Sequence, residues 1–361
     1  MKGRTLVDEQ NEVCRTGILT FHDADNQGAV LQAYALQSAL RRIPDVLPEI
    51  IHYRCEAVEA TKKITVKCLR DAMKAIPMMV YYAIKHRGFQ TFRKKYLELS
   101  SSRYSRATIG RAAEAYDVYI TGSDQVWNLG CSGNDSTYFL DFVSEKKRRS
   151  SYAASMGNCQ YGPQERQTIA DELKKFDYIS VREGSSIGKL EQMGISGAQV
   201  HLDPVFLLNR QEWLPVMSRR LLREKYVFVY LIQEDVNVFA AARDYAQKHG
   251  CKIISNKTSL KYILNGSPSD FLSWIYYAEA VFTNSFHGTA FSVLFGKKLG
   301  ADVELRSGGV NNRICELLQT VHGEACMLCD DNWNVSDEFD EALLTKQIHT
   351  AEDYLRLICT R

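Results

Sequence analysis

The fold is decided by one stretch of the sequence, Ala280-Val281-Phe282-Thr283-Asn284-Ser285-Phe286-His287-Gly288-Thr289-Ala290-Phe291-Ser292-Val293-Leu294-Phe295-Gly296. Its first four residues form an apolar run typical of a buried strand, and the small polar residues after them predict a turn. A helical pattern of apolar residues then begins at Thr289. The order strand, turn, helix is typical of α/β folds, in which the free N–H groups and the dipole of the helix favour an anion at the turn.

This turn would present three polar side chains, Asn284, Ser285 and His287, and Gly288 would let a backbone or a ligand come close. The alternative is a buried histidine that only hydrogen-bonds its neighbours. Because His287 follows the expected end of a strand and stands among other small polar groups, we interpret the turn as a functional site.

A second strand–turn–helix unit lies near the N-terminus. Residues 16–21 are predicted to form a strand, residues 22–28 a polar turn, and residues 29–40 a helix. The turn has one glycine and lacks the GxGxxG pattern, so it is only loosely similar to a phosphate-binding turn. Asp25 or Asn26 can instead cap the helix, and a cap and a binding site are compatible.

Two further predicted strands also end in polar residues. Residues 116–121 lead into Asp124, a candidate acid, base or hydroxyl anchor, whose alternative role is to cap its loop. Residues 176–181 lead into Arg182, which can grip a carboxylate or a phosphate with two hydrogen bonds. The alternative for Arg182 is an ion pair with Glu183 or another nearby acid.

Strands alternate with helices in both halves of the chain, which predicts an α/β fold of two Rossmann-like domains with parallel sheets. The pattern restarts at Tyr226, after an expected linker over 213–224. We therefore expect an N-terminal domain over 1–212, a C-terminal domain over 225–342, and a closing helix over 343–361 that can pack back on the N-terminal domain. Residues 138–142 are predicted to form an edge strand. The polar strand ends would open toward a cleft between the domains.

Composition excludes several classes of protein. The 361 residues include 45% hydrophobic and 24% charged residues, which is typical of a globular protein, and the net charge of +2 gives no indication of nucleic-acid binding. Ten scattered cysteines suit a reducing cytosol, so we expect a cytoplasmic location. The one CxxC pair, Cys326 and Cys329, has no partner at zinc spacing, and we expect no metal. The first fifteen residues carry no apolar signal core.

The region 62–95 differs from the rest, with ten Lys or Arg residues and one acidic residue, Asp71. A basic segment with an apolar centre can rest on an anionic membrane surface, so we consider a peripheral contact with the inner face of the membrane. The alternative is a helical excursion packed on its own domain. Pro77 is expected to break a continuous helix in this region.

Several short motifs together resemble one family, the polysaccharide pyruvyl transferases. They are Ile18-Leu19-Thr20-Phe21, Asn26-Gln27-Gly28-Ala29-Val30-Leu31-Gln32-Ala33-Tyr34-Ala35-Leu36, Ile120-Thr121-Gly122-Ser123-Asp124-Gln125-Val126-Trp127-Asn128, Ser151-Tyr152-Ala153-Ala154-Ser155, Ile179-Ser180-Val181-Arg182-Glu183, Leu202-Asp203-Pro204, Thr283-Asn284-Ser285-Phe286-His287-Gly288-Thr289 and Asn312-Arg313. The resemblance covers most of the chain and leaves out the basic region and the acidic tail.

The resemblance implies a GT-B-like fold and a chemistry. The pyruvyl group of phosphoenolpyruvate would be moved onto a sugar of a polysaccharide precursor, such as a capsular polysaccharide or an exopolysaccharide, usually as a cyclic ketal. Phosphoenolpyruvate is then a co-substrate, no cofactor is expected, and the acceptor can be a lipid-linked oligosaccharide. His287 and Asp124 correspond to catalytic residues. The expected donor-binding residues are Arg182, Asn284, Ser285, Gly288, Arg306 and Arg313. The expected acceptor-binding residues are Asp23, Asn26, Gln27, Gln125 and Trp127.

One departure from the family pattern stands beside the histidine. Other members have an arginine two residues before it, where this chain has Ser285, so Arg182, Arg306 or Arg313 would have to supply the missing charge. Two other functions remain open at this stage. One is a GT-B glycosyltransferase that uses a sugar nucleotide, and the other is a non-catalytic protein of polysaccharide assembly.

Overall fold

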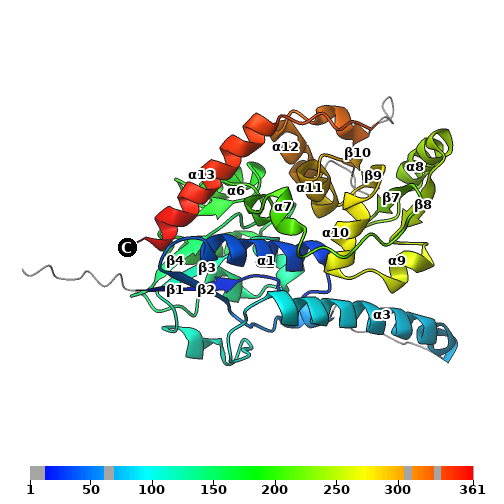
Figure 1. Ribbon diagram of the computed structural model, residues 1–361. Coiled ribbons are helices and arrows are strands. Elements are labelled where there is room, and N and C mark those ends of the chain that lie inside the picture. The colour runs from blue at the N-terminus through cyan, green and yellow to red at the C-terminus, as the bar shows by residue number, and fades with distance from the viewer. Residues whose placement is uncertain (1–12, 61–68, 305–310, 329–334, 361) are drawn as a thin grey trace, which may run out of the picture.

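The computed structural model describes residues 13–60, 69–304, 311–328 and 335–360, with the backbone alone for 69–78. Arg306 and Cys329 lie outside these residues, as does part of the basic region. Two parallel sheets form the framework of the molecule (Figure 1).

The first sheet has the strand order β2-β1-β3-β4, and all its strands are parallel. Its strands are β1 (Cys14–Leu19), β2 (Val46–Ile50), β3 (Val118–Thr121) and β4 (Arg148–Ser151). Isolated bridges from β4 continue it toward the short parallel pair β5 (Ser180–Val181) and β6 (Gln199–Val200). The helices of this half are α1 (Gln27–Arg41), α2 (Glu56–Ala60), α3 (Leu69–Tyr96), α4 (Leu129–Ser132), α5 (Pro163–Leu173), α6 (Ser185–Gln192) and α7 (Arg210–Trp213), with the 3-10 turns η1 (Ile109–Ala112), η2 (Ser136–Phe139) and η3 (Pro204–Leu207).

The second sheet has the order β11-β10-β9-β7-β8 and is also parallel. Its strands are β7 (Tyr226–Tyr230), β8 (Lys252–Ser255), β9 (Ala280–Thr283), β10 (Lys298–Asp302) and β11 (Met327–Leu328). The accompanying helices are α8 (Val236–His249), α9 (Leu260–Leu264), α10 (Pro268–Tyr276), α11 (Phe286–Leu294) and α12 (Asn312–Thr320), with η4 (Glu324–Cys326) before β11. The strand β9 that opens the decisive stretch lies at the centre of this sheet.

The two halves share one hydrophobic core. Helix α1 is buried on most of its surface and packs against η3 on one side and α10 on the other. Trp213, at the start of the segment predicted as a linker, is fully buried and lies edge-on to Phe291 at 5.0 Å between ring centroids. The linker therefore begins inside the core, which ties the two halves together.

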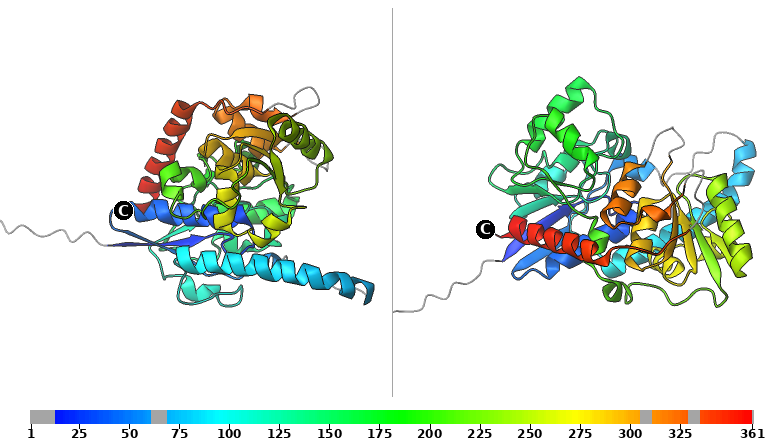
Figure 2. Two further views of the ribbon diagram at one scale, coloured as in Figure 1. Left: turned by 45° about the vertical axis from the view of Figure 1, so that its right-hand side comes forward. Right: turned by 90° about the horizontal axis from the view of Figure 1, so that it is seen from above.

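The last helix, α13 (Glu341–Cys359), returns to the first half of the molecule (Figure 2). The Tyr354 hydroxyl donates to the Ser151 carbonyl, at the end of β4, and Arg148 donates to the Ile358 carbonyl. These two contacts fix the helix along the outer side of the first sheet.

Two predictions about elements were wrong. Residues 138–142 form no strand: η2 is capped by Asp135, whose side chain accepts from the Thr137 N–H, and Leu140 adopts a left-handed backbone with φ of 56°. Helix α3 also continues through Pro77, against our expectation of a break. It runs beside α9 and α10 and extends to the edge of the molecule (Figure 1). In the part of the chain that is described, none of the helices combines the length and apolar content of a membrane span.

Candidate functional site

A cleft of about 720 Å³ lies between the two halves. The N-terminal ends of three helices, α1, α11 and α12, contribute to its wall. Its lining includes Asn26, Gly28, Lys85, Asp124, Gln125, Asn284, Ser285, His287, Asn311 and Arg313. Because free N–H groups at helix N-termini favour anions, the cleft suits a negatively charged ligand.

His287 occupies the second position of α11. The helix begins at Phe286, earlier than predicted, because the Ser285 hydroxyl accepts from the Gly288 N–H at 3.3 Å and caps it. The imidazole Nε2 lies 3.5 Å from a carboxylate oxygen of Asp203 and has no hydrogen-bond partner among the described residues. Nε2 is thus turned to this carboxylate, and Nδ1 lies on the side of the ring that packs against Gly28.

The histidine ring lies directly over Gly28, at the start of α1 in the other half. A Cβ atom on Gly28 would stand 1.9 Å from Nδ1 and 2.2 Å from Cγ of His287. Only glycine therefore leaves space for the ring in this position. The position of His287 depends on both halves of the molecule.

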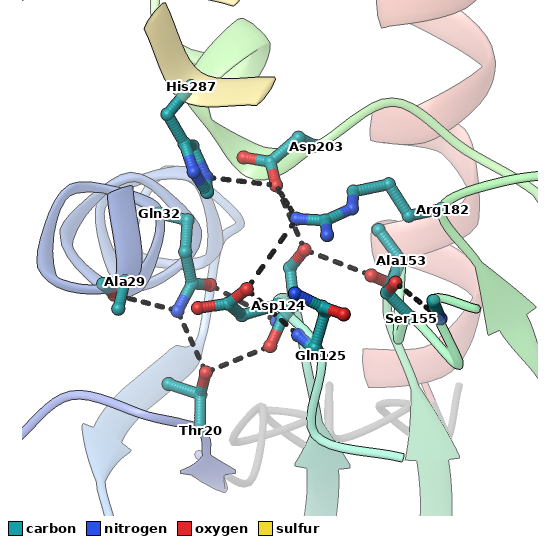
Figure 3. Close-up of polar contacts among 12 residues, drawn as sticks. Thr20, Ala29, Gln32, Asp124, Gln125, Ala153, Ser155, Arg182, Asp203 and His287 are labelled. Atoms are coloured by element: carbon teal, nitrogen blue, oxygen red, sulfur yellow. Dashed lines mark hydrogen bonds and ion pairs between the residues drawn. The ribbon is translucent and has the colours of Figure 1, made fainter. Parts of the chain in front are cut away.

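Asp203 is a buried carboxylate that lies between His287 and Arg182 (Figure 3). Its Oδ2 accepts hydrogen bonds from Arg182 Nη1 at 2.8 Å and from the Ser123 hydroxyl at 3.1 Å. Burial alone would raise the pKa of Asp203, but His287 and Arg182 outweigh it and hold that pKa well below its ordinary value. Asp203 is thus a negative charge 3.5 Å from the imidazole.

Arg182 lies between two carboxylates and behind the wall of the cleft. Besides its bond to Asp203, its Nη1 is 3.9 Å from Asp124 Oδ1, and its guanidinium stacks over the Phe286 ring at 4.4 Å. Burial would lower the pKa of Arg182, but Asp203, Asp124 and Glu183 raise it. Its Nε and Nη2 have no hydrogen-bond partner among the described residues. In this structure Arg182 orients the carboxylates, and its predicted contact with the donor stays a prediction.

Asp124 reaches the cleft from the loop after β3. Its backbone is left-handed, with φ of 72°, and its Oδ1 accepts from the Gln125 N–H at 2.8 Å. Buried hydrogen bonds of the Gln32 side chain hold this loop (Figure 3). Gln32 Nε2 donates to the Thr20 hydroxyl, and the Ser123 N–H donates to Gln32 Oε1. Both the predicted site role and the predicted cap of Asp124 are compatible with this geometry.

Arg313 supplies a positive charge on the cleft wall near Asp124. It stands in the first turn of α12, whose N-cap Asn311 makes no side-chain capping bond. Among the described residues, the Arg313 guanidinium has no ion-pair partner, and burial together with the nearby Arg182 lowers its pKa. An arginine side chain remains charged nonetheless. Within the described part of the chain, Arg313 is therefore a cation without an ion-pair partner at the N-terminus of α12.

A family model described as polysaccharide pyruvyl transferase matches residues 26–299, more than half of the sequence. The chain belongs to the polysaccharide pyruvyl transferase family. This finding confirms the resemblance, and the matched residues include Asp124, Arg182, Asp203 and His287. A comparison with curated proteins found no match.

Solved structures similar to this polysaccharide pyruvyl transferase family member are GT-B-type enzymes. A protein described as a UDP-N-acetylglucosamine 2-epimerase, from Listeria monocytogenes, matches with a TM-score of 0.51 and 11% identity over 97% of this chain and 91% of its own. The UDP-GlcNAc 2-epimerase from Methanocaldococcus jannaschii matches with a TM-score of 0.48 and 12% identity over 93% of this chain and 91% of its own. At such identities the likeness shows the fold alone, and the first match confirms the predicted two-domain Rossmann-like fold.

Not every residue predicted for the site of this family member lies at the cleft. Trp127 is fully buried, with its ring stacked on Phe139 and its Nε1 donating to the Tyr138 carbonyl. Its predicted contact with the acceptor was therefore wrong, since the ring belongs to the core.

Three more predicted residues have structural roles. Gln27 bridges the halves, because its Nε2 donates to the Tyr262 hydroxyl and its Oε1 accepts from the Tyr230 hydroxyl. Asp23 lines a separate hollow and faces Arg103 at 3.3 Å. Gly288 packs on Thr283, whose Oγ1 would lie 2.5 Å from an added Cβ. None of the three lines the cleft between the halves.

Asn284 lines the cleft as predicted, but its amide groups are already committed. Its Oδ1 accepts from the Ile232 N–H at 2.8 Å, and its Nδ2 donates to the Gln233 carbonyl at 3.0 Å. Asn284 thus fixes the loop after β7 beside the turn after β9.

Sequence reasoning missed two residues of the site. Asp203 follows β6 just as Asp124 follows β3, so the rule applied to the other strand ends would have selected it. Lys85 lines the cleft from α3, which lies outside the motifs that carried the resemblance. No signal in the sequence separates Lys85 from the many basic residues around it.

Proposed function

We propose that this chain transfers the pyruvyl group of phosphoenolpyruvate to a sugar, as a cyclic ketal, and releases phosphate. The observation that carries the proposal is that one cleft is lined by His287, with Asp203 next to its ring, and by Arg313 at the N-terminus of α12, which has no ion-pair partner among the described residues. The donor has both a carboxylate and a phosphate, and such groups are bound by arginine and by helix N-termini.

The proposed reaction needs an acid, a base and an anion site. Protonation of C3 of the enol makes C2 electrophilic, and a sugar hydroxyl then adds to C2. The bond from C2 to the phosphate oxygen breaks, and a second hydroxyl completes the ketal. Of the two hydroxyl protons, one balances the proton gained at C3 and the other leaves with the phosphate.

We assign the proton transfers to the imidazole of His287, which lines the cleft. Asp203 fixes the ring through Nε2 and stabilises the protonated imidazole, as carboxylates do for catalytic histidines. Asp124 lines the same cleft and can accept a hydrogen bond from the acceptor hydroxyl. Arg313 is assigned to the donor and takes the place of the family arginine that Ser285 replaces.

Donor identity can be tested by thermal shift of the purified full chain with phosphoenolpyruvate or with UDP. A ligand at about one hundred times its Kd stabilises the folded state by about 2.7 kcal/mol, which a melting curve resolves. We expect phosphoenolpyruvate to raise the Tm of the wild type and of Lys248→Gln, an exposed control on α8, but not of Arg313→Gln. Stabilisation by UDP alone would instead favour a sugar-nucleotide enzyme.

A peripheral membrane contact of the basic region is a separate proposal. Met79 and Val80 of α3 are exposed, with 57% and 55% of their surface accessible. Cosedimentation with vesicles that contain anionic lipid would test the contact. Binding that is unchanged after the lysines and arginines of 62–95 are neutralised would contradict it.

A further inference from the structure

A second, smaller pocket of about 210 Å³ opens beside the cleft. Its lining residues Lys85 and Tyr262 belong to α3 and α9, and these two helices lie together at the end of the molecule away from α13 (Figure 1). The two cavities share part of their lining: Asp25, Asn26, Lys85, Tyr230 and Ile232. A ligand in the cleft can therefore extend into this pocket.

Most polar side chains of the pocket are already committed to the protein. Gln27 is bound to two tyrosines, as described above. Asn256 holds the Leu231 backbone, accepting from its N–H and donating to its carbonyl, each at 2.9 Å. Both oxygens of Asp25 are taken, Oδ1 by Arg93 and Oδ2 by His86, each at 2.7 Å. These groups shape the pocket and leave little capacity for a ligand.

Two lysines remain. Lys85 lines both cavities, and in the described part of the chain its ammonium has no hydrogen-bond or ion-pair partner, lying 5.7 Å from the Phe89 ring centroid. Lys257 lines the small pocket and donates to one carbonyl, that of Ile232, at 3.0 Å. Burial lowers the pKa of Lys85, Asp25 raises it, and Lys257 lowers it further, so the two ammonium groups repel each other. Two cations line this pocket, and its carboxylate, Asp25, is already bound to Arg93 and His86, so the pocket suits a ligand with more than one negative charge.

We propose that Lys85 and Lys257 form a phosphate-binding subsite that holds a phosphate group on the sugar acceptor. This inference rests on the proposed function. A phosphate has several acceptor oxygens and up to two charges, which matches two ammonium groups and the adjacent N-terminus of α1. The acceptor is then a glycosyl phosphate, with its sugar in the cleft between Lys85 and His287.

The donor is assigned to the other end of the cleft. Arg313 interacts electrostatically with Arg182, Glu183 and Asp124, whereas Lys85 interacts with Asp25 and Lys257. His287 lies over Gly28 and lines the same cleft as Lys85 and Arg313. Two separate groups of cations on the cleft that holds the proton-transfer residue fit a reaction between two anionic substrates.

The test is a calorimetric titration of α-glucose 1-phosphate into the full chain saturated with phosphoenolpyruvate, with glucose as the neutral counterpart. The variants are Lys85→Gln/Lys257→Gln and the matched control Lys248→Gln/Lys261→Gln, which removes two exposed charges outside the pocket. We expect glucose 1-phosphate to bind the wild type and the control, and to bind the pocket variant about tenfold or more weakly, since each lost bond is charge-assisted. The affinity for phosphoenolpyruvate should be the same in all three proteins.

Several results would overturn the proposal. They are no binding of glucose 1-phosphate to the wild type, equal affinity in both double variants, or equal binding of glucose. A loss of phosphoenolpyruvate affinity in the pocket variant would place the lysines at the donor. If only cosedimentation with phosphatidic acid vesicles responds to the variant, the lysines meet a lipid headgroup. Phosphoenolpyruvate can also fail to bind all three proteins, while glucose 1-phosphate binds the wild type and the control more tightly than the pocket variant. In that case the subsite is supported and the proposed donor is wrong.

Discussion

Replacing Gly28 by alanine should displace His287, the residue proposed to transfer protons, without changing its own side chain. The added Cβ would stand 1.9 Å from Nδ1 of His287, whereas ordinary contacts of this kind begin near 3.4 Å. The ring and the start of α1 therefore have to separate by about 1.5 Å, given the usual contact distance between non-bonded heavy atoms. The two elements belong to different halves, so the change also strains the contact between them.

The effect on activity should exceed the effect on stability. Overpacking costs about 1–3 kcal/mol. Alanine gains up to about 1 kcal/mol over glycine in a helix, so the net loss should be on the order of 1 kcal/mol. A misplacement of about 1 Å can cost a reaction about 100-fold, and we expect kcat to fall by that order.

The assay is phosphate release from phosphoenolpyruvate with a glycosyl acceptor, combined with melting curves. Gly188→Ala is the matched control, because it lies in α6 and its Cβ would meet nothing within 4 Å. In a His287→Ala background the ring is gone, so Gly28→Ala should add little further loss. Near-normal turnover of Gly28→Ala, or equal losses in both backgrounds, would refute the reasoning.

Three further predictions follow from buried polar groups. Tyr230→Phe leaves Gln27 Oε1 without its 2.9 Å donor and should lower the free energy of unfolding by about 1–3 kcal/mol in urea titrations, whereas an unchanged midpoint would contradict the bridge. Arg182→Gln leaves Asp203 Oδ2 without its 2.8 Å guanidinium donor and should cost about 3–5 kcal/mol in the same titrations; a loss below 1 kcal/mol would show that the pair is not essential to the fold. Burial lowers the pKa of His22 from 6.5 to about 4, so the unfolded chain binds a proton there that the folded chain does not. Unfolding should therefore become easier as the pH falls from 6.5 toward 4, by about 3 kcal/mol over that range, and His22→Gln should flatten the dependence.

Much of the site could be predicted from the sequence because the strands are parallel. Asn26, Asp124 and His287 each follow a buried strand, and the carboxyl ends of parallel strands meet at one edge. That rule brought residues 98 or more positions apart to one cleft. It also located Arg182 correctly at a strand end, but it could not show that the side chain turns away from the cleft toward Asp203.

The remaining errors have local causes. Trp127 follows a strand, as the residues that line the cleft do, but its ring is apolar and is buried in the core. The spacing of apolar residues in the sequence does not predict in which direction a side chain points after a turn. Residues 138–142 carry the composition of a strand, yet the cap from Asp135 stabilises a 3-10 turn. The strand β10 (Lys298–Asp302) was missed because its lysine and glycine have low β-propensity, and its pairing with β9 decides its structure.

The most direct test of the central claim is acceptor-dependent phosphate release from phosphoenolpyruvate by wild type, His287→Ala and Arg313→Gln. The acceptors would be lipid-linked galactosyl, mannosyl and N-acetylhexosaminyl sugars. The account predicts release that requires one of these acceptors, falls by about 100-fold or more in His287→Ala as expected for a general acid–base catalyst, and needs higher phosphoenolpyruvate concentrations in Arg313→Gln. Release that is unchanged in His287→Ala would contradict the assignment of proton transfer to the residue on which the two halves meet.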